Sequence, residues 1–263
     1  MAGNSAFEMV NEQGWRRGFS NLVAHEFSRW WKTRMWWTHS LIWIAVIGFM
    51  LGAVLLSGPV ADETEGKMIY SVFAGLFPAV GVVILAQGIL VGEKKGGTAA
   101  WVMSNPASRP AFIVSKVVAN SLGILVTMVV LPGLAAYIIF TIADHAAPDP
   151  LAFVAALGVI FLHQLFYLTL TIMLGSLFTA RGPVIGIGLG LLFLQQYLVG
   201  LLPPLRYVLP WTLVIPLGSQ GDAVVPALLM GKPVSEPLQI LIIALECVIF
   251  VLVSVWRFNR EEL

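Results

Sequence analysis

The stretch ANSLGILVTMVVLPGLAAYIIFTI, residues 119–142, carries no charged side chain over 24 consecutive residues. An α-helix needs about 20 predominantly apolar residues to cross the hydrocarbon core of a bilayer. The rest of the chain has the same character, because its 263 residues are 58% hydrophobic and only 11% charged, whereas a soluble domain carries about 25% charged residues. Its long runs are apolar on all sides and not on one face, which indicates that lipid surrounds them. The fold class predicted is therefore an all-α polytopic membrane protein.

Six such runs predict six transmembrane helices. A cytoplasmic N-terminal region, residues 1–36, precedes a transmembrane domain over 37–256, and a short tail, 257–263, follows it. The predicted spans are Trp37–Ser57, Tyr70–Val91, Ala119–Ile142, Leu151–Phe178, Pro183–Leu202 and Leu238–Trp256.

The distribution of Lys and Arg predicts the orientation, because these residues are enriched in cytoplasmic loops. With six spans both termini lie on one side. Three basic residues fall on the other side, namely Lys67, Arg206 and Lys232. Twelve fall on the side of the termini: Arg16, Arg17, Arg29, Lys32, Arg34, Lys94, Lys95, Arg109, Lys116, Arg181, Arg257 and Arg260. We therefore expect an integral protein of a prokaryotic plasma membrane with both termini in the cytoplasm.

The segment 202–237 is apolar but interrupted by prolines. A seventh span near Tyr207–Met230 would move the C-terminus to the outside, together with Arg257 and Arg260. One or two short re-entrant or interfacial helices on the outer face are the preferred interpretation, since irregular backbone at membrane depth has to be covered by protein or water.

The motifs of several protein classes are missing from the sequence. A net charge of +1 argues against a nucleic-acid partner held by bulk electrostatics. The chain has no G-x-x-x-x-G-K-[ST] phosphate loop, no H-E-x-x-H zinc motif and no G-x-S-x-G nucleophile motif. We therefore predict no catalytic residues, no metal and no cofactor bound by this chain.

An amphipathic helix is predicted ahead of the first span, over Phe19–Arg34. One arc of this helix is apolar and rich in tryptophan, and the other is polar and basic, which is typical of a helix lying in the headgroup layer. Glu26 falls inside the apolar arc. Two explanations stay open: a pair with Arg29 or Lys32, or a contact to another protein.

The loop between the second and third spans, residues 92–117, predicts a short helix bounded by helix breakers. Gly96 and Gly97 precede this helix, Thr98 can cap its first turn, and Asn105-Pro106 ends it. Ser108 with Pro110 then starts the third helix ahead of its membrane-spanning part, and Lys116 can snorkel to the interface. A short helix projecting from two spans is suited to transmitting motion between a soluble partner and the membrane bundle.

These residues resemble the permeases of type-2 ABC exporters. The family carries in this loop a glutamate, basic residues, Gly-Thr, a short helix, then Pro, Ser-Arg and a Lys. The matching positions are Glu93, Lys94, Lys95, Gly97, Thr98, Pro106, Ser108, Arg109 and Lys116. The interfacial helix with Ala24-His25-Glu26-Phe27 and the proline-rich outer segment are similar too. One position departs from the family pattern, since Ala100 stands where the family usually has an acidic residue.

The resemblance implies a permease that transports a substrate with ATP hydrolysed elsewhere. ATP and Mg would be bound by a separate ABC ATPase (nucleotide-binding) subunit, and a second permease copy would complete a homo- or heterodimer in the lipid. The substrate expected is a drug, peptide or lipid that is exported or flipped. The residues expected to couple to the ATPase are Glu26, Glu93, Gly97, Thr98, Trp101, Met103, Pro106 and Arg109.

Polar residues inside the spans are candidates for the translocation path. The resemblance implies that the second and fifth spans line the interface between two permease halves, which points to Gln87, Gln195 and Gln196. Glu246 lies near the middle of the sixth span, where a bare carboxylate costs roughly 2.5–3.5 kcal/mol. For each residue the alternative is a hydrogen bond between helices.

Two other functions stay open at this stage. An ATP-independent carrier would show internal repeats and paired ionisable residues at mid-membrane. A membrane assembly or maturation factor, for example for a metalloenzyme, is excluded by no residue of the chain.

Overall fold

The computed structural model describes residues 13–55, 63–104, 106–143, 147–217 and 223–261. Helices and their connections make up this described part, which contains no β-strand. The α-helices are α1 Phe19–Trp31, α2 Met35–Leu55, α3 Glu63–Ala86, α4 Val91–Lys95, α5 Thr98–Met103, α6 Arg109–Ile124, α7 Leu131–Ala143, α8 Pro150–Leu177, α9 Arg181–Leu201, α10 Trp211–Val214, α11 Val224–Leu229 and α12 Pro237–Asn259. Two short 3₁₀ helices, η1 Gly14–Arg16 and η3 Pro203–Tyr207, and one π-helical segment, η2 Leu125–Val130, complete the set.

Six helical segments in the described residues are long and apolar enough to cross a membrane, which confirms the predicted number and the fold class. They are Met35–Leu55, Thr64–Lys95, Arg109–Ala143, Pro150–Leu177, Arg181–Leu201 and Pro237–Asn259. The second and third segments are longer than predicted. Ser57, where the first span was predicted to end, lies outside the described residues.

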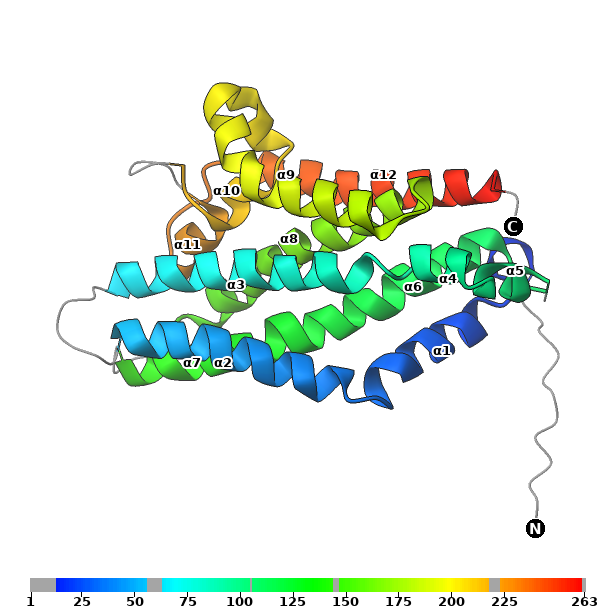
Figure 1. Cartoon of the computed structure of the whole chain (residues 1–263). Coiled ribbons are helices and arrows are strands. Elements are labelled where there is room, and N and C mark those ends of the chain that lie inside the picture. The colour runs from blue at the N-terminus through cyan, green and yellow to red at the C-terminus, as the bar shows by residue number, and fades with distance from the viewer. Residues whose placement is uncertain (1–12, 56–62, 105, 144–146, 218–222, 262–263) are drawn as a thin grey trace, which may run out of the picture.

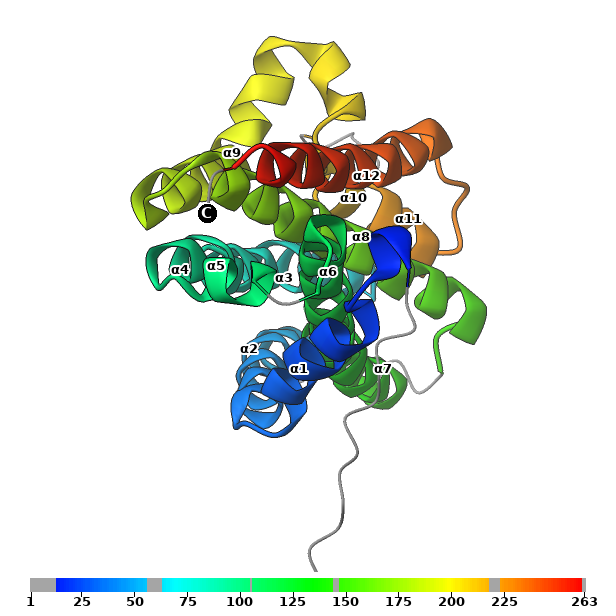
Figure 2. The same ribbon diagram turned by 90° about the vertical axis from the view of Figure 1, so that its right-hand side faces the viewer.

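The helices form an elongated bundle whose two ends differ (Figure 1). At one end lie α1, α4, α5 and the last turn of α12, and we call it the basic end because it carries the Lys and Arg residues grouped with the termini above. Figure 2 views the bundle from this end, with α1 and α5 on either side of the start of α6. At the opposite end lie the starts of α3 and α12.

The third span begins ten residues before the predicted Ala119 because its first turn is capped and its lysine is neutralised. Ser108 is the N-cap, and its Oγ accepts a hydrogen bond from the Ala111 amide at 3.1 Å. Lys116, about two turns further in, is buried among carboxylates and does not end the helix. A π-helical segment then joins α6 to α7, and Thr127 Oγ1 donates to the Gly123 carbonyl at 2.8 Å just where it begins.

The second span is interrupted close to the basic end. Residues 87–90 form a turn between α3 and α4, and α5 follows after Gly96 and Gly97. Gly97 adopts a φ of +69°, a left-handed conformation that favours glycine, and it is the N-cap of α5. Thr98 is therefore the first residue of this helix and not its cap, which corrects the prediction. Asn105, predicted to end the helix, lies outside the described residues.

The described part of the proline-rich segment 202–237 forms three short helices: η3, α10 and α11. None is long enough to span a bilayer. Residues of α10 are buried, and Ser71 of α3 donates its hydroxyl hydrogen to the Val214 carbonyl at 2.5 Å. Gln239 of α12 donates to the Leu209 carbonyl at 3.0 Å and to Thr212 Oγ1 at 2.7 Å. These bonds satisfy part of the irregular backbone with protein groups.

Candidate functional site

At the basic end, α1 packs directly on α6. The Trp30 side chain is 1% exposed, and its indole lies against Gly123, where a Cβ atom would collide with the ring. Its Nε1 donates to Asn120 Oδ1 at 3.1 Å. Near the start of both helices, the Ser108 amide donates to the Arg17 carbonyl at 2.9 Å. The predicted apolar arc of α1 therefore covers protein through Trp30, while Phe27 stays exposed.

Lys116 of α6 is the centre of a buried ion cluster. Its Nζ lies 2.5 Å from Glu26 Oε1 of α1 and 2.5 Å from Glu93 Oε1 of α4. The side chain of Lys116 is 1% exposed, that of Glu26 8% and that of Glu93 23%. The partner of Glu26 within the described residues is Lys116 and not Arg29 or Lys32, which corrects the first explanation, and the contact to another protein stays a prediction. Lys116 does not snorkel either, since two carboxylates neutralise it inside the protein.

Two further cations of the same loop bind the carboxyl ends of other helices. Lys94 Nζ donates to the Ser176 carbonyl at the end of α8, at 3.0 Å, and lies 2.9 Å from Glu261 Oε1. Arg109 Nη1 donates to three carbonyls that end α12, at 2.7–3.0 Å: those of Phe258, Asn259 and Glu261. A cation is favourable at a helix C-terminus because it meets unpaired carbonyls and the negative end of the helix dipole. Lys94, Arg109 and Lys116 together tie the loop 92–116 to α1, α8 and α12.

The short helix α5 presents a mixed surface. Ala99 is buried beneath it, Met103 is half-buried, and Thr98 and Pro106 are exposed. Trp101 is 70% exposed, more than any other tryptophan in the described residues. Anchored through Glu93 on one side and Arg109 on the other, this helix is held firmly relative to the spans.

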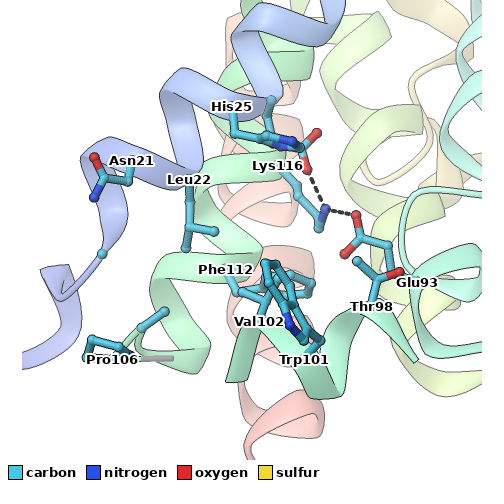
Figure 3. A pocket seen from close by; sticks show the side chains of 13 residues that line it. Asn21, Leu22, His25, Glu93, Thr98, Trp101, Val102, Pro106, Phe112 and Lys116 are labelled. Carbon is cyan, nitrogen blue, oxygen red and sulfur yellow. Dashed lines mark hydrogen bonds and ion pairs between the residues drawn. The ribbon is translucent and has the colours of Figure 1, made fainter. Parts of the chain in front are cut away.

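A pocket of about 450 Å³ opens between α1, α5 and α6 (Figure 3). It contains five of the eight residues predicted to couple to an ATPase: Glu26, Glu93, Thr98, Trp101 and Pro106. Gly97 lines a neighbouring pocket of about 470 Å³ with Lys94, Lys95 and Ala100. Met103 and Arg109 line neither of these two pockets. Most of the predicted coupling residues thus converge on one place.

The predicted translocation residues do not converge in the same way. Gln195 is fully buried, and its Nε2 donates to Tyr167 Oη at 2.8 Å and to the Leu192 carbonyl at 3.1 Å. This is the interhelical bond that was kept as the alternative. Gln196 is half-buried on the same helix. Gln87 lies in the turn before α4, and Glu246 is half-buried on α12; each has one buried side-chain oxygen without a hydrogen-bond partner in the described structure.

Several residues that shape the site were not predicted: Trp30, Asn120, Gly123 and the role of Lys116. The spacing of these residues in the sequence could have indicated that they share helix faces. Lys116, Asn120 and Gly123 follow at i, i+4 and i+7, and Glu26 and Trp30 follow at i and i+4, so each set shares one helix face. Pairing the two faces required the tertiary structure, because spacing along one helix does not identify its partner.

Comparison with known proteins agrees with this architecture. The sequence profile of the family described as "ABC-2 family transporter protein" matches residues 20–263. A curated relative, the "Uncharacterized transmembrane protein YxlG" of Bacillus subtilis (strain 168), is 27% identical over 182 residues, which are 69% of this chain and 67% of the relative. Because the family match extends from the first helix to the last residue, this chain belongs to the ABC-2 family of transporter membrane proteins.

Proposed function

We propose that this chain is the permease subunit of an ATP-binding-cassette transporter that exports or flips an amphipathic or hydrophobic substrate, such as a drug, peptide or lipid. ATP and Mg are bound by a separate ABC ATPase subunit, and two permease halves enclose the path. Membership in the ABC-2 family supports association with such an ATPase. The observation that carries the proposal is the anchored position of α5 at the basic end.

The anchoring explains how a push on α5 can reach the membrane. Glu93, Lys94 and Arg109 flank this helix and bind α6, α8 and α12 respectively. Buried charge pairs hold a fixed geometry, because separating them leaves an uncompensated charge in a low dielectric. A displacement of α5 by a partner would therefore shift the inner ends of several spans together. Rigid-body rocking of two halves is a common form of such transitions.

The face of α9 that points away from the bundle supports the proposed second permease copy. A Cβ atom added at Gly182, Gly186 or Gly190 would meet nothing within 4 Å. These glycines repeat every four residues, a spacing that allows close helix–helix approach in membranes. Gly188, by contrast, faces Val83 of α3, with the added Cβ only 2.9 Å away. The two sides of α9 thus fit two different neighbours.

Substitution of the exposed residues of α5 tests the coupling role. In a reconstituted complex with its ATPase, Trp101→Ala should reduce substrate-stimulated ATP hydrolysis by about tenfold or more, because an exposed tryptophan at an interface is a frequent binding hot spot. Val208→Ala, at the opposite end, serves as the control and should have no effect. Hydrolysis that stays coupled in Trp101→Ala, or a functional wild-type protein without any nucleotide-hydrolysing companion, would refute the proposal.

The proposed orientation has its own test. The single native cysteine, Cys247, is buried, so cysteines introduced at exposed positions can be labelled separately. In intact cells a membrane-impermeant maleimide should label Lys232→Cys and leave Ser104→Cys unlabelled until the cells are opened. The reverse pattern would place α5 outside the cell and exclude contact with a cytoplasmic ATPase.

A further inference from the structure

The pocket between α1, α5 and α6 has apolar walls and a charged floor. Leu22, Val102 and Phe112 line its walls, and the indole of Trp101 stands at its side (Figure 3). Lys116 and its two carboxylate partners form the floor. An occupant therefore needs an apolar stem and a polar end.

The floor has a formal charge of −1, because one ammonium faces two carboxylates. Lys116 is fully engaged, since its Nζ contacts both Glu26 and Glu93 at 2.5 Å and it is 1% exposed. Glu93, at 23% exposure, is the more accessible of the two carboxylates that line the pocket. Among the described lining residues, His25 is the only other side chain able to carry positive charge. The nearby Lys94 is bound to Ser176 and Glu261 instead.

Excess negative charge in a largely apolar pocket is unfavourable unless a cation approaches it. The exposed indole of Trp101 favours the same kind of occupant, because cations bind the faces of aromatic rings. One such contact already exists in the floor, where the Lys116 ammonium lies 4.6 Å from the centre of the Phe112 ring. An anionic lipid headgroup would be repelled by Glu93 and is a poorer fit.

We propose that the partner ATPase inserts an arginine side chain into this pocket, with its guanidinium on Glu93 and its plane against Trp101. Arginine fits better than lysine because its planar group can bind a carboxylate through two hydrogen bonds and stack on an indole at the same time. This inference rests on the proposed function and adds the chemistry of the contact. Glu93 then has two interactions: an ion pair with Lys116 inside the protein and hydrogen bonds to the guanidinium of the partner.

A double-mutant cycle between Glu93 and the arginines of the ATPase tests the inference. Full-length permease in lipid nanodiscs is titrated with the ATPase that co-purifies with it. Glu93→Gln leaves the Lys116–Glu26 pair intact and should weaken binding about tenfold or more, as loss of a close interfacial charge pair does. One arginine-to-methionine variant of the ATPase should weaken binding to the wild type equally and bind Glu93→Gln with no further loss. Glu93→Asp, which keeps the charge, should recover part of the affinity, and Glu236→Gln at the opposite end should stay within twofold of wild type.

The outcomes separate this inference from the proposed function. If wild-type permease binds the ATPase and Glu93→Gln binds it within twofold, the inserted arginine is wrong while the permease function stands. Loss of affinity that couples to no arginine of the ATPase also overturns the inference. If Glu93→Gln melts at a lower temperature than the wild type, the same cycle is run with Trp101→Leu, which removes the aromatic face without changing the charge. A wild-type permease that binds no ATPase overturns both.

Discussion

The ion cluster at the basic end and the interior of the spans both bury polar side chains, but they satisfy them differently. At the basic end, the buried ammonium of Lys116 has two carboxylate partners, and Arg109 has three carbonyl acceptors. Inside the spans, hydrogen-bonding capacity is left over in the described structure. Gln164 and Gln195 each donate through Nε2, yet the Oε1 of each has no partner, and the same holds for a carboxylate oxygen of Glu246.

This difference indicates which part can rearrange. A buried acceptor without a hydrogen bond costs about 1–3 kcal/mol. A rearrangement of the spans can therefore gain hydrogen bonds, whereas a rearrangement within the ion cluster can only lose them. A rigid ion cluster attached to spans with unused acceptors suits a permease in which a partner moves one end and the bundle adopts a second state.

The largest effect is expected from removing the cation of the cluster. Lys116→Met leaves two carboxylates together without a counter-charge, and breaking a buried pair in this way costs about 3–5 kcal/mol. Thermal unfolding of the purified protein in detergent should show a clearly lower midpoint. The triple variant Lys116→Met, Glu26→Gln, Glu93→Gln removes all three charges and should recover most of the loss. An unchanged midpoint for the single variant would mean that the cluster contributes nothing to rigidity.

A smaller loss of stability is expected from a substitution where α1 meets the third span. Gly123→Ala forces the new methyl group into the Trp30 indole, and overpacking of this kind costs about 1–3 kcal/mol. Hydrogen exchange of the α1 amides should accelerate, because the displaced indole also weakens its bond to Asn120. Gly158→Ala on α8 is the matched control, since its Cβ position is open. Equal exchange in both variants would show that α1 is not held by this contact.

The smallest loss of stability is expected from substitutions inside the spans. Gln195→Met removes the hydrogen bond to Tyr167 but also the unpartnered Oε1, so the net loss should be within about 1 kcal/mol. Tyr167→Phe breaks the same bond from the other side and should shift the melting midpoint by a similar amount. Transport should be less sensitive to either change than to Trp101→Ala. A loss from Gln195→Met as large as that from Lys116→Met would abolish the distinction between the two regions.

Much of the architecture could be predicted because it depends on composition over long windows. Runs without charge predicted six spans, and Ser108 with Pro110 correctly predicted where the third helix begins. Predictions from neighbouring residues were wrong where the interaction partner is distant in the sequence. Lys116 looked like an interfacial lysine, so the third span was predicted to start after it, at Ala119. Its two counter-charges could not be recognised, because they lie 90 and 23 residues away in sequence.

The amino-acid sequence by itself determined that this chain is a six-span helical membrane protein with its Lys and Arg residues gathered at one end, since burial in lipid is decided by the apolarity of each segment. Only the tertiary structure decided the partners of the charged residues. Glu26 and Glu93 become one cluster because α1 packs on α6 and α4 brings Glu93 to Lys116 of the same helix. Lys94 and Arg109 become caps because α8 and α12 end beside them. Such pairings arise from the relative placement of helices, and hydrophobic periodicity within a single helix carries no information about it.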